Sequence, residues 1–428
     1  MHKSLRIWTL LSLLLPLMTW AQGLQLYGLQ HVLPNSPLTS DFELVAIDPL
    51  SAQGTPLYTI PNTRGVESAS SVFNPSASRY LFWGTNDNDE ARFYSAATDT
   101  PLWEDTIVQE DRPLELQYDL QAERTYGLLQ GENNAGLTFI EVDEATGHYT
   151  PIASLSGVLF VEMGTSTFDA NHHRYFFIGI DANNYAKRLY SLDARSGQVL
   201  TASDPLSASR HIRTLHYDLN TDQLLALYAA PDPSRPQNPA GFAYYSTYLA
   251  EVDSLSGSVA VISNSALFGG YQASVILGSS DFDQLSRIVV AAVVNETGVK
   301  RLLLVQANDG SLIIDQPFPQ DIYELKCDNR SYAEQAYTGS TSRAALPVVT
   351  FRSYPNPATD QVTVELPGDQ AGATLRLIDG QGRLVQQRTL RPMQQTERLD
   401  LRTLPMGVYL LQVQVPGQKP TTQRLIKR

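Results

Sequence analysis

Cysteine and charged residues are scarce in this chain. Cys327 is the single cysteine among 428 residues, so no internal disulfide can form and folding depends on packing. We interpret Cys327 as a small apolar residue buried in a strand. Charged residues make up 18% and aromatic residues 9% of the chain, which is typical of an ordered, strand-rich protein. The 31 basic residues are outnumbered by 44 acidic ones, which argues against nucleic acid as a partner.

Motifs of common catalytic sites are also missing. The sequence contains no GxSxG, HExxH, CxxC or phosphate-binding loop, and each of these would have indicated a reaction class. His172 and His173 are adjacent, but they fall in a predicted tight turn, where neighbouring side chains diverge. This favours a solvated turn over a metal site and leaves no set of catalytic residues to name.

Long apolar runs are confined to the amino terminus. Lys3 and Arg6 precede the apolar segment Ile7–Trp20, and small residues flank Trp20. This pattern predicts a secretory signal peptide over residues 1–21, cleaved after Ala21. A membrane anchor is the alternative, but this run is too short to cross the hydrocarbon core and no later run is long enough. The sequence therefore predicts an exported protein without a transmembrane segment.

A sequence pattern that predicts two short strands around an Asp-to-Gly turn recurs along the chain. The clearest copy is Lys187–Ser203, in which Gly197 can take the positive φ that such a hairpin needs. Other copies begin at Phe42, Ala91, Leu137, Thr247 and Arg301. Six copies spaced by about fifty residues indicate a repeat architecture.

Another pair of strands precedes most of these hairpins. Each pair contains an aromatic residue, then Asn or Asp, a short polar turn and an apolar strand. The Asx side chain suits the turn because it can bond its own backbone two residues on. These pairs begin at Ser70, Leu116, Ser166, Leu215 and Ser279. Two strand pairs make a four-stranded antiparallel unit, which is the blade of a β-propeller.

The two ends of the repeat region complete one blade. The first hairpin has a single preceding strand, Leu24–Val32, whereas Ile322–Asp328 resembles the first strand of a blade and is followed by no further copy. We therefore expect these segments to pair and close a six-bladed propeller over residues 22–328. A seven-bladed ring with one unrecognised blade and two packed sandwiches remain alternatives, although the even spacing argues against sandwiches.

The pattern changes after the propeller. Residues 329–350 are small and polar without periodicity, and we interpret them as an exposed linker. Residues 351–428 contain short alternating or apolar runs separated by Gly and Pro turns. They predict a small immunoglobulin-like antiparallel β-sandwich, so the whole chain is expected to be all-β.

Four stretches of this last segment carry a family resemblance. They are Tyr354–Ala358, Leu377–Val385, Leu404–Val413 and Gln423–Arg428. In this order, at the end of a chain with a signal peptide, they resemble the type A sorting domain of the Bacteroidetes type IX secretion system. The matching residues are Pro355, Asn356, Pro357, Gly382, Gly407, Tyr409, Lys427 and Arg428.

The resemblance implies a route rather than a ligand. It implies that the signal peptide directs passage across the inner membrane and that the sorting domain engages the type IX machinery at the outer membrane. In that family the domain is often removed at the surface, and the cargo is attached to lipopolysaccharide or released. The resemblance says nothing about what the propeller binds.

Acidic residues recur near the start of the innermost strand. An apolar residue is followed by Glu67, Glu115, Glu162 and Glu324 in four repeats, and Arg213 takes this place in another. Strand alternation would direct these glutamates into the channel, where four carboxylates repel unless a cation, bound water or Arg213 offsets them. Calcium is therefore the candidate cofactor, and glutamates facing solvent at the rim are the alternative.

Loops between the second and third strands of the blades are rich in Asn and Asp. These residues suit both ordinary turns and hard cations. The longest such loop, Pro231–Tyr245, adds proline and tyrosine and is the best candidate for a contact surface.

Two functions are compatible with these features. The first is a binding or adhesion module, secreted or held at the cell surface, that recognises an extracellular protein or glycan. The second is an extracellular hydrolase or lyase with its site at the propeller channel. The fold alone does not decide between them, and the missing catalytic motifs favour binding.

Overall fold

The computed structural model describes residues 24–32, 41–107, 112–131, 136–207, 211–238, 241, 243–271, 274–318, 322–338, 351–366, 373–379, 384–390, 396–414 and 421–428. The predicted signal peptide, Gly382 and residues 339–350 lie outside this set. The chain divides into two compact units, Met1–Thr98 with Asp105–Glu334, and Asp99–Glu104 with Gln335–Arg428. In the described part, no helix combines the length and the apolar character needed to cross a membrane.

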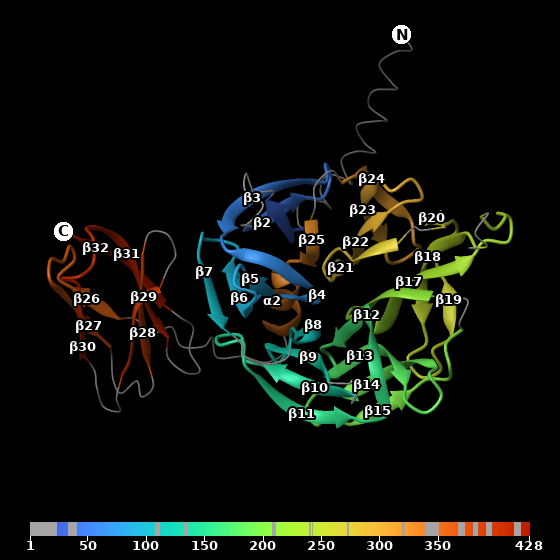
Figure 1. Cartoon of the computed structure of the whole chain (residues 1–428), viewed down its shortest axis with the longest axis horizontal. Helices are drawn as coiled ribbons and strands as arrows, with labels where there is room; N and C mark the ends of the chain where they lie inside the picture. Colours follow the sequence, from blue (N-terminus) through green and yellow to red (C-terminus); the bar gives the residue numbers. More distant parts are fainter. Residues whose placement is uncertain are drawn as a thin grey trace, which may run out of the picture. The chain divides into compact units, whose positions relative to one another are not determined.

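The first unit consists of six antiparallel sheets, here called blades 1 to 6, arranged around a common centre (Figure 1). Blade 1 contains β25 (Ile322–Cys327), β1 (Leu26–Val32), β2 (Asp41–Asp48) and β3 (Gln53–Ile60). Blade 2 contains β4 (Thr63–Asn74), β5 (Arg79–Asn86), β6 (Ala91–Ala97) and β7 (Trp103–Ile107). Blade 3 contains β8 (Leu114–Asp119), β9 (Arg124–Gln130), β10 (Leu137–Val142) and β11 (Tyr149–Leu155).

Blades 4 to 6 repeat this order. Blade 4 contains β12 (Val158–Asp169), β13 (Arg174–Asp181), β14 (Lys187–Asp193) and β15 (Val199–Ala202). Blade 5 contains β16 (His211–Asp218), β17 (Gln223–Pro231), β18 (Tyr245–Val252) and β19 (Val259–Val261), with β20 (Phe268–Gly270) as an additional strand on β18. Blade 6 contains β21 (Ser274–Asp283), β22 (Ile288–Val294), β23 (Lys300–Gln306) and β24 (Leu312–Pro317).

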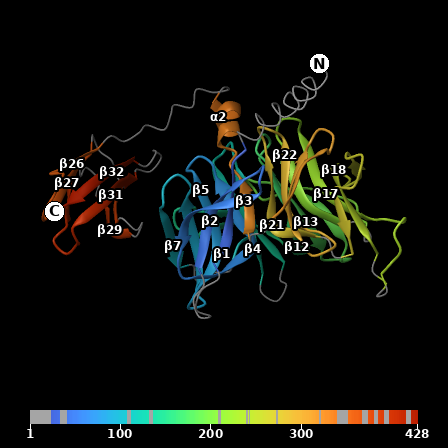
Figure 2. The same ribbon diagram turned by 90° about the horizontal axis from the view of Figure 1, so that it is seen from above.

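Blade 1 is assembled from both ends of the repeat region. β25 pairs antiparallel with β1, so that Leu26 lies opposite Cys327 and Gln30 opposite Ile322. The innermost strands β4, β8, β12, β16, β21 and β25 contact one another in sequence around the axis, and Figure 2 shows the ring from its edge. The predicted six-bladed propeller is therefore confirmed, and the seven-bladed and sandwich alternatives are wrong.

A buried Asx residue is the last residue of the innermost strand in five blades and directly follows it in blade 1. Asp119 is typical, because its Oδ1 accepts the backbone N–H groups of Gln121 and Ala122, each at 2.9 Å. The equivalent residues, all buried, are Asn74, Asp169, Asp218, Asp283 and Asp328. The fourth residue after the Asx has a left-handed backbone in five blades, at Ser78, Glu123, His173, Asp222 and Arg287. Because these turns are formed by residues close together in the sequence, the strand pairs could be predicted from the sequence.

Apolar side chains from neighbouring blades pack between the sheets. One cluster joins blades 1 and 6, and it includes Val290, Leu325 and Cys327. Another joins blades 2 and 3 through Trp83 and Leu129. Cys327 is 2% exposed, which confirms its interpretation as a buried apolar residue. Burial of these inward faces is the main stabilising term for the ring.

The predicted linker is wrong over its first part. Residues Arg330–Thr338 form the helix α2. Its start is fixed because Asp328 Oδ1 accepts the N–H of Arg330 at 3.0 Å and Asn329 Nδ2 donates to Phe282 O at 3.0 Å, while Tyr332 is buried. The helix escaped prediction because its contacts come from distant residues and its own apolar periodicity is weak.

The second unit is a two-layer β-sandwich, as predicted. One sheet contains β26 (Arg352–Tyr354), β27 (Gln361–Glu365) and β30 (Thr396–Asp400). The other contains β29 (Leu384–Thr389), β28 (Thr374–Ile378), β31 (Gly407–Gln414) and β32 (Thr421–Lys427). Alternate residues of the strands, including Val362, Leu377 and Leu411, form its core.

Candidate functional site

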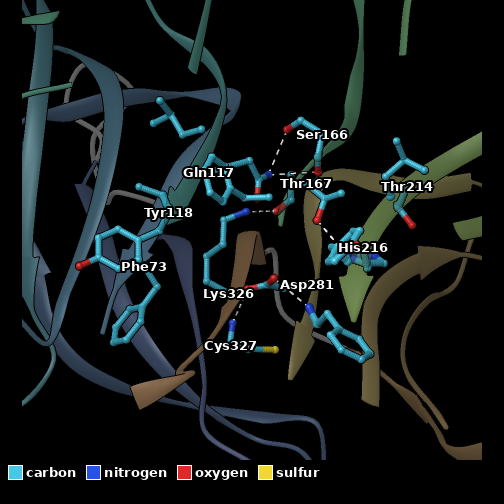
Figure 3. A pocket seen from close by; sticks show the side chains of 18 of the residues that line it. Phe73, Gln117, Tyr118, Ser166, Thr167, Thr214, His216, Asp281, Lys326 and Cys327 are labelled. Atoms are coloured by element: carbon cyan, nitrogen blue, oxygen red, sulfur yellow. Dashed lines mark hydrogen bonds between the residues drawn. The ribbon is translucent and has the colours of Figure 1, made fainter. Parts of the chain in front are cut away.

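A cavity of about 110 Å³ lies on the propeller axis and is lined by all six innermost strands. Figure 3 shows Gln117, His216 and Lys326 around it. These three residues come from blades 3, 5 and 1, and each lies two positions before the buried Asx of its strand. Their equivalent positions give the cavity an amide, an imidazole and an amine at one level of the channel.

Each of these polar groups has a partner on the following or preceding blade. Gln117 Nε2 donates to Ser166 O at 3.1 Å and to its Oγ at 3.0 Å. His216 Nε2 lies 2.9 Å from Ser280 Oγ. Lys326 Nζ donates to Gly278 O at 3.1 Å. The cavity wall is therefore held by bonds between neighbouring blades.

Glu115 and Glu324 are buried beside this cavity. Glu324 Oε1 accepts the N–H of Ala69 at 2.7 Å, and its Oε2 accepts the hydroxyl of Ser71 at 2.6 Å. Glu115 Oε1 accepts the N–H of Gly164 at 2.5 Å. Both carboxyl groups thus hold the next blade, and both residues have a left-handed backbone, with φ of 57° and 56°.

Burial is the main cause of the pKa shifts of the channel groups. Desolvation raises the pKa of Glu115 to about 7, although the bond from Gly164 opposes the shift. Desolvation also raises the pKa of Glu324 and of Asp281, and in both cases Lys326 opposes it. Burial, with Lys326 as a second cause, lowers the pKa of His216 to about 3. At neutral pH, His216 is therefore uncharged.

The structure does not bring the four predicted glutamates together. Glu67 pairs with Arg112, and Glu162 Oε2 lies 2.6 Å from Lys187 Nζ. The reason is the distance along the strand, since Glu67 and Glu162 precede the Asx by seven residues and Glu115 and Glu324 by four. Bulges of different length separate the two pairs. The hypothesis of a four-carboxylate calcium site was based on a wrong register.

Arg213 lines the cavity, but it does not offset the glutamates through an ion pair among the described residues. Burial lowers its pKa, and its buried Nε has no hydrogen-bond partner in the described part of the chain. The sequence analysis missed Lys326, His216 and Thr214. Lys326 and His216 lie two residues before the buried Asx and Thr214 lies four before it, and counting back from the Asx was the signal that could have identified them.

One group of side chains has the spacing of metal ligands among the residues the structure describes. It consists of Asp169, His172 and Asp222, whose ligand atoms lie within 4.8 Å of one another. Arg174 Nε already donates to Asp169 Oδ2 at 2.8 Å, and Tyr217 OH donates to Asp222 at 2.5 Å. These bonds explain the cluster as a turn network.

The long loop after β17 packs on itself. Tyr244 is buried, with the guanidinium of Arg235 4.6 Å above its ring centre and the ring of Tyr271 5.3 Å away. Tyr271 OH donates to Pro236 O at 2.7 Å. Tyr244, one of the aromatic residues that made this loop a candidate contact surface, is therefore part of the packing of the loop.

The matching residues of the second unit surround its last strand. Asn356 Nδ2 donates to Arg424 O at 2.6 Å, and Asn356 Oδ1 accepts the N–H of Ile426 at 2.9 Å. Lys427 forms a bridge with Ala358, while Tyr409 OH donates to Pro405 O at 2.8 Å. Gly407 begins β31, and Pro355, Pro357 and Arg428 are exposed.

Residues 352–428 match the family model of the secretion system C-terminal sorting domain. This segment is a type IX sorting domain. The sorting domain identifies the type IX machinery as a partner and supports secretion or a cell-surface location. Together with the first unit, it makes the chain an exported propeller protein.

Solved structures with a similar arrangement share little sequence with the chain. TolB from Acinetobacter baumannii is 15% identical with a TM-score of 0.47, and the match covers 72% of this chain and 67% of TolB. Hydrazine synthase from Kuenenia stuttgartiensis is 11% identical with a TM-score of 0.41, covering 65% and 76%. No curated protein matches the sequence significantly. The blade topology described above therefore carries the fold assignment.

Proposed function

We propose that the protein is a binding module that recognises an extracellular protein or glycan through the axial cavity of its propeller. Residues 1–21 serve as the signal peptide, residues 22–328 form the binding domain, and the sorting domain delivers the protein to the cell surface or medium. The binding role is supported by the cavity, and the route is supported by the sorting domain.

One observation carries the binding role. The cavity wall contains buried polar atoms without hydrogen-bond partners in the described structure, namely Arg213 Nε and Thr214 Oγ1. Leaving such a group unpaired costs about 1–3 kcal/mol, and a bound ligand would recover part of this cost. A cavity of about 110 Å³ accepts a small polar group, either as a free molecule or as the end of a protein or glycan.

Calorimetry on the full chain tests the proposal. A panel of short peptides, sugars, small carboxylates and amines should contain at least one compound that binds the parent. Thr214→Leu, which fills the cavity, should remove that binding, whereas Thr55→Leu on exposed β3 should retain it. A folded Thr214→Leu protein that binds every compound like the parent would overturn the axial site.

A hydrolase or lyase is the second candidate, because Glu115 has a pKa of about 7 and such a carboxyl group can transfer protons at neutral pH. Two contacts weigh against it. Glu115 is already bonded to Gly164, and Ser280 Oγ donates to Val290 O at 3.0 Å, so His216 does not activate that hydroxyl. Turnover of polysaccharides, lactones or phosphoesters that Glu115→Gln abolishes would establish the enzyme.

A further inference from the structure

The inner wall of the propeller repeats every two blades. Blades 2, 4 and 6 carry a long bulge, where the register shifts between Val66 and Ser71, Val161 and Ser166, and Val275 and Ser280. Each bulge contains one left-handed residue at the same position: Ala69 (φ 56°), Gly164 (φ 79°) and Gly278 (φ 71°). Together with the preceding blade, each bulge forms a comparable site around the axis, here called a station.

Two stations are closed by the protein itself. At the first, the carboxyl group of Glu324 accepts bonds from Ala69 and Ser71, and Tyr80 OH donates to Glu324 O. At the second, the carboxyl group of Glu115 accepts the N–H of Gly164, and Tyr175 OH donates to Glu115 O. A Glu and a Tyr thus fill each of these stations.

The third station has neither residue. Counting from the buried Asx, Thr214 stands where the other two strands have Glu. Its backbone is not left-handed, because the register of β16 shifts between Ile212 and Thr214, one residue earlier than at Glu115 and Glu324. Strand register places Val289 opposite Phe282, where Tyr80 faces Phe73 and Tyr175 faces Phe168 in the other blades. Both replacements are shorter, so the station loses a carboxyl group and a phenol together.

Unpartnered polar atoms mark this station. Thr214 is 3% and Ser279 0% exposed, and neither hydroxyl has a hydrogen-bond partner in the described structure. Thr214, Gly278 and Ser280 line the axial cavity. Gly278 also lies against Glu324, so that a Cβ there would collide with this carboxyl group. The third station therefore shares the bulge of the other two and lacks their Glu and Tyr.

We propose that the third station binds the carboxylate group of a small ligand, in the place that the carboxyl groups of Glu115 and Glu324 take at the other two. The amide of Gly278 corresponds to the amides of Ala69 and Gly164, and the hydroxyl of Thr214 adds a second donor. Lys326, bonded to Gly278 O at 3.1 Å, places its charge beside the station. The inference rests on the proposed axial binding site.

The free groups at this station favour an anion over an amine. The oxygens of Asp281 already accept the N–H groups of Phe282 at 2.8 Å and Cys327 at 2.7 Å, and both oxygens of Glu324 are bonded. An ammonium group would have to share these oxygens with the donors that already hold them. Arg213 Nε, in contrast, is a buried donor without a partner among the described residues.

The volume sets the size of the ligand. The cavity of about 110 Å³ is smaller than a cavity of about 150 Å³ that holds benzene. It accepts a group of the size of acetate or propionate, or the carboxylate end of a longer molecule in the channel.

Acetate is the probe for the full-chain protein, with methylammonium as the matched cation. Calorimetry should detect binding of acetate and no binding of methylammonium. Line broadening of ¹³C-labelled acetate gives a second measurement of acetate binding. Thr214→Glu places a carboxyl group at this position and should abolish acetate binding. Thr214→Val keeps the shape without the hydroxyl, and should weaken acetate about five- to tenfold. If Thr214→Glu does not fold, Thr214→Val still tests the contact.

The outcomes separate this inference from the proposed function. Acetate binding that is unchanged in Thr214→Val and Thr214→Glu overturns the station. Absence of acetate binding, with another compound bound by the parent and lost in Thr214→Leu, also overturns the carboxylate assignment and leaves the axial site intact. The axial site itself is overturned only if the folded Thr214→Leu protein binds every compound as the parent does.

Discussion

Arg287 of blade 6 donates from Nε to Oδ2 of Asp218 in blade 5, across 2.7 Å. Asp218 is fully buried, and the Arg287 side chain is 23% exposed. Contacts of the same kind recur, since His173 Nδ1 of blade 4 lies 2.8 Å from Asp119 Oδ2 of blade 3. Asp119 and Asp218 thus shape their turns and also join neighbouring blades.

Arg287→Ala should destabilise the propeller by about 3–5 kcal/mol, because it leaves the buried charge of Asp218 without its partner. Urea denaturation measures this loss. Arg124→Ala is the control, since its pair with Glu141 is more exposed, at 55% and 34%, and should contribute less than about 1 kcal/mol. Equal effects of the two changes would contradict the role of the inter-blade bond.

Glu115→Gln should remove a pH dependence of stability. The folded pKa of about 7 exceeds the ordinary value of 4.5, so the folded state keeps a proton that the unfolded chain releases. The contribution of Glu115 is therefore fully present below pH 4.5 and is lost as the pH rises to 7, by about 3 kcal/mol. Denaturation of parent and variant at several pH values gives this difference directly.

The pH dependence of stability that His216 contributes has the opposite sign to that of Glu115, and it falls in an overlapping pH range. Its folded pKa of about 3 lies below the ordinary 6.5, so its contribution is lost as the pH falls below 6.5. Comparing the parent with Glu115→Gln cancels this term. A constant difference between the two proteins from pH 4.5 to 8 would contradict the raised pKa of Glu115.

Leu325→Ala should weaken closure of the ring. Leu325 is fully buried in β25, in the cluster shared by blades 1 and 6. Its truncation should cost about 2–5 kcal/mol, read as a lower urea midpoint. Leu312→Ala on β24, where the side chain is 39% exposed, is the matched control. A midpoint that moves no further than in the control would show that β25 is dispensable.

Deletion of Ser353–Arg428 should leave a folded propeller that remains in the periplasm, because the deleted segment is the sorting domain. Cell fractionation and the Tm of the purified product measure the two effects. Met406→Ala in the full chain changes a side chain that is 79% exposed and should be exported normally. Normal surface or extracellular levels of the truncated protein would contradict the assigned route.

The repeats were predictable because their signals are local. The Asp193-to-Gly197 turn and the Asx turns are encoded within a few residues, so hairpins and blades follow from the sequence. The sorting domain was predictable for a similar reason, since its matching stretches occur in a fixed order. The helix α2 was missed because Asn329 bonds to Phe282, far away in the chain, and Tyr332 is buried only in the folded protein.

The sequence by itself determined the six blades, the strand that closes them and the carboxy-terminal sorting domain, because alternation, turn residues and family pattern are all properties of short segments. Only the tertiary structure decided which residues face the axis. Bulges in the innermost strands shift the register by different amounts, and a shift of one residue moves a side chain to the other face. For that reason Glu115 and Glu324 join blades, Glu67 and Glu162 form separate ion pairs, and Thr214 marks the open station.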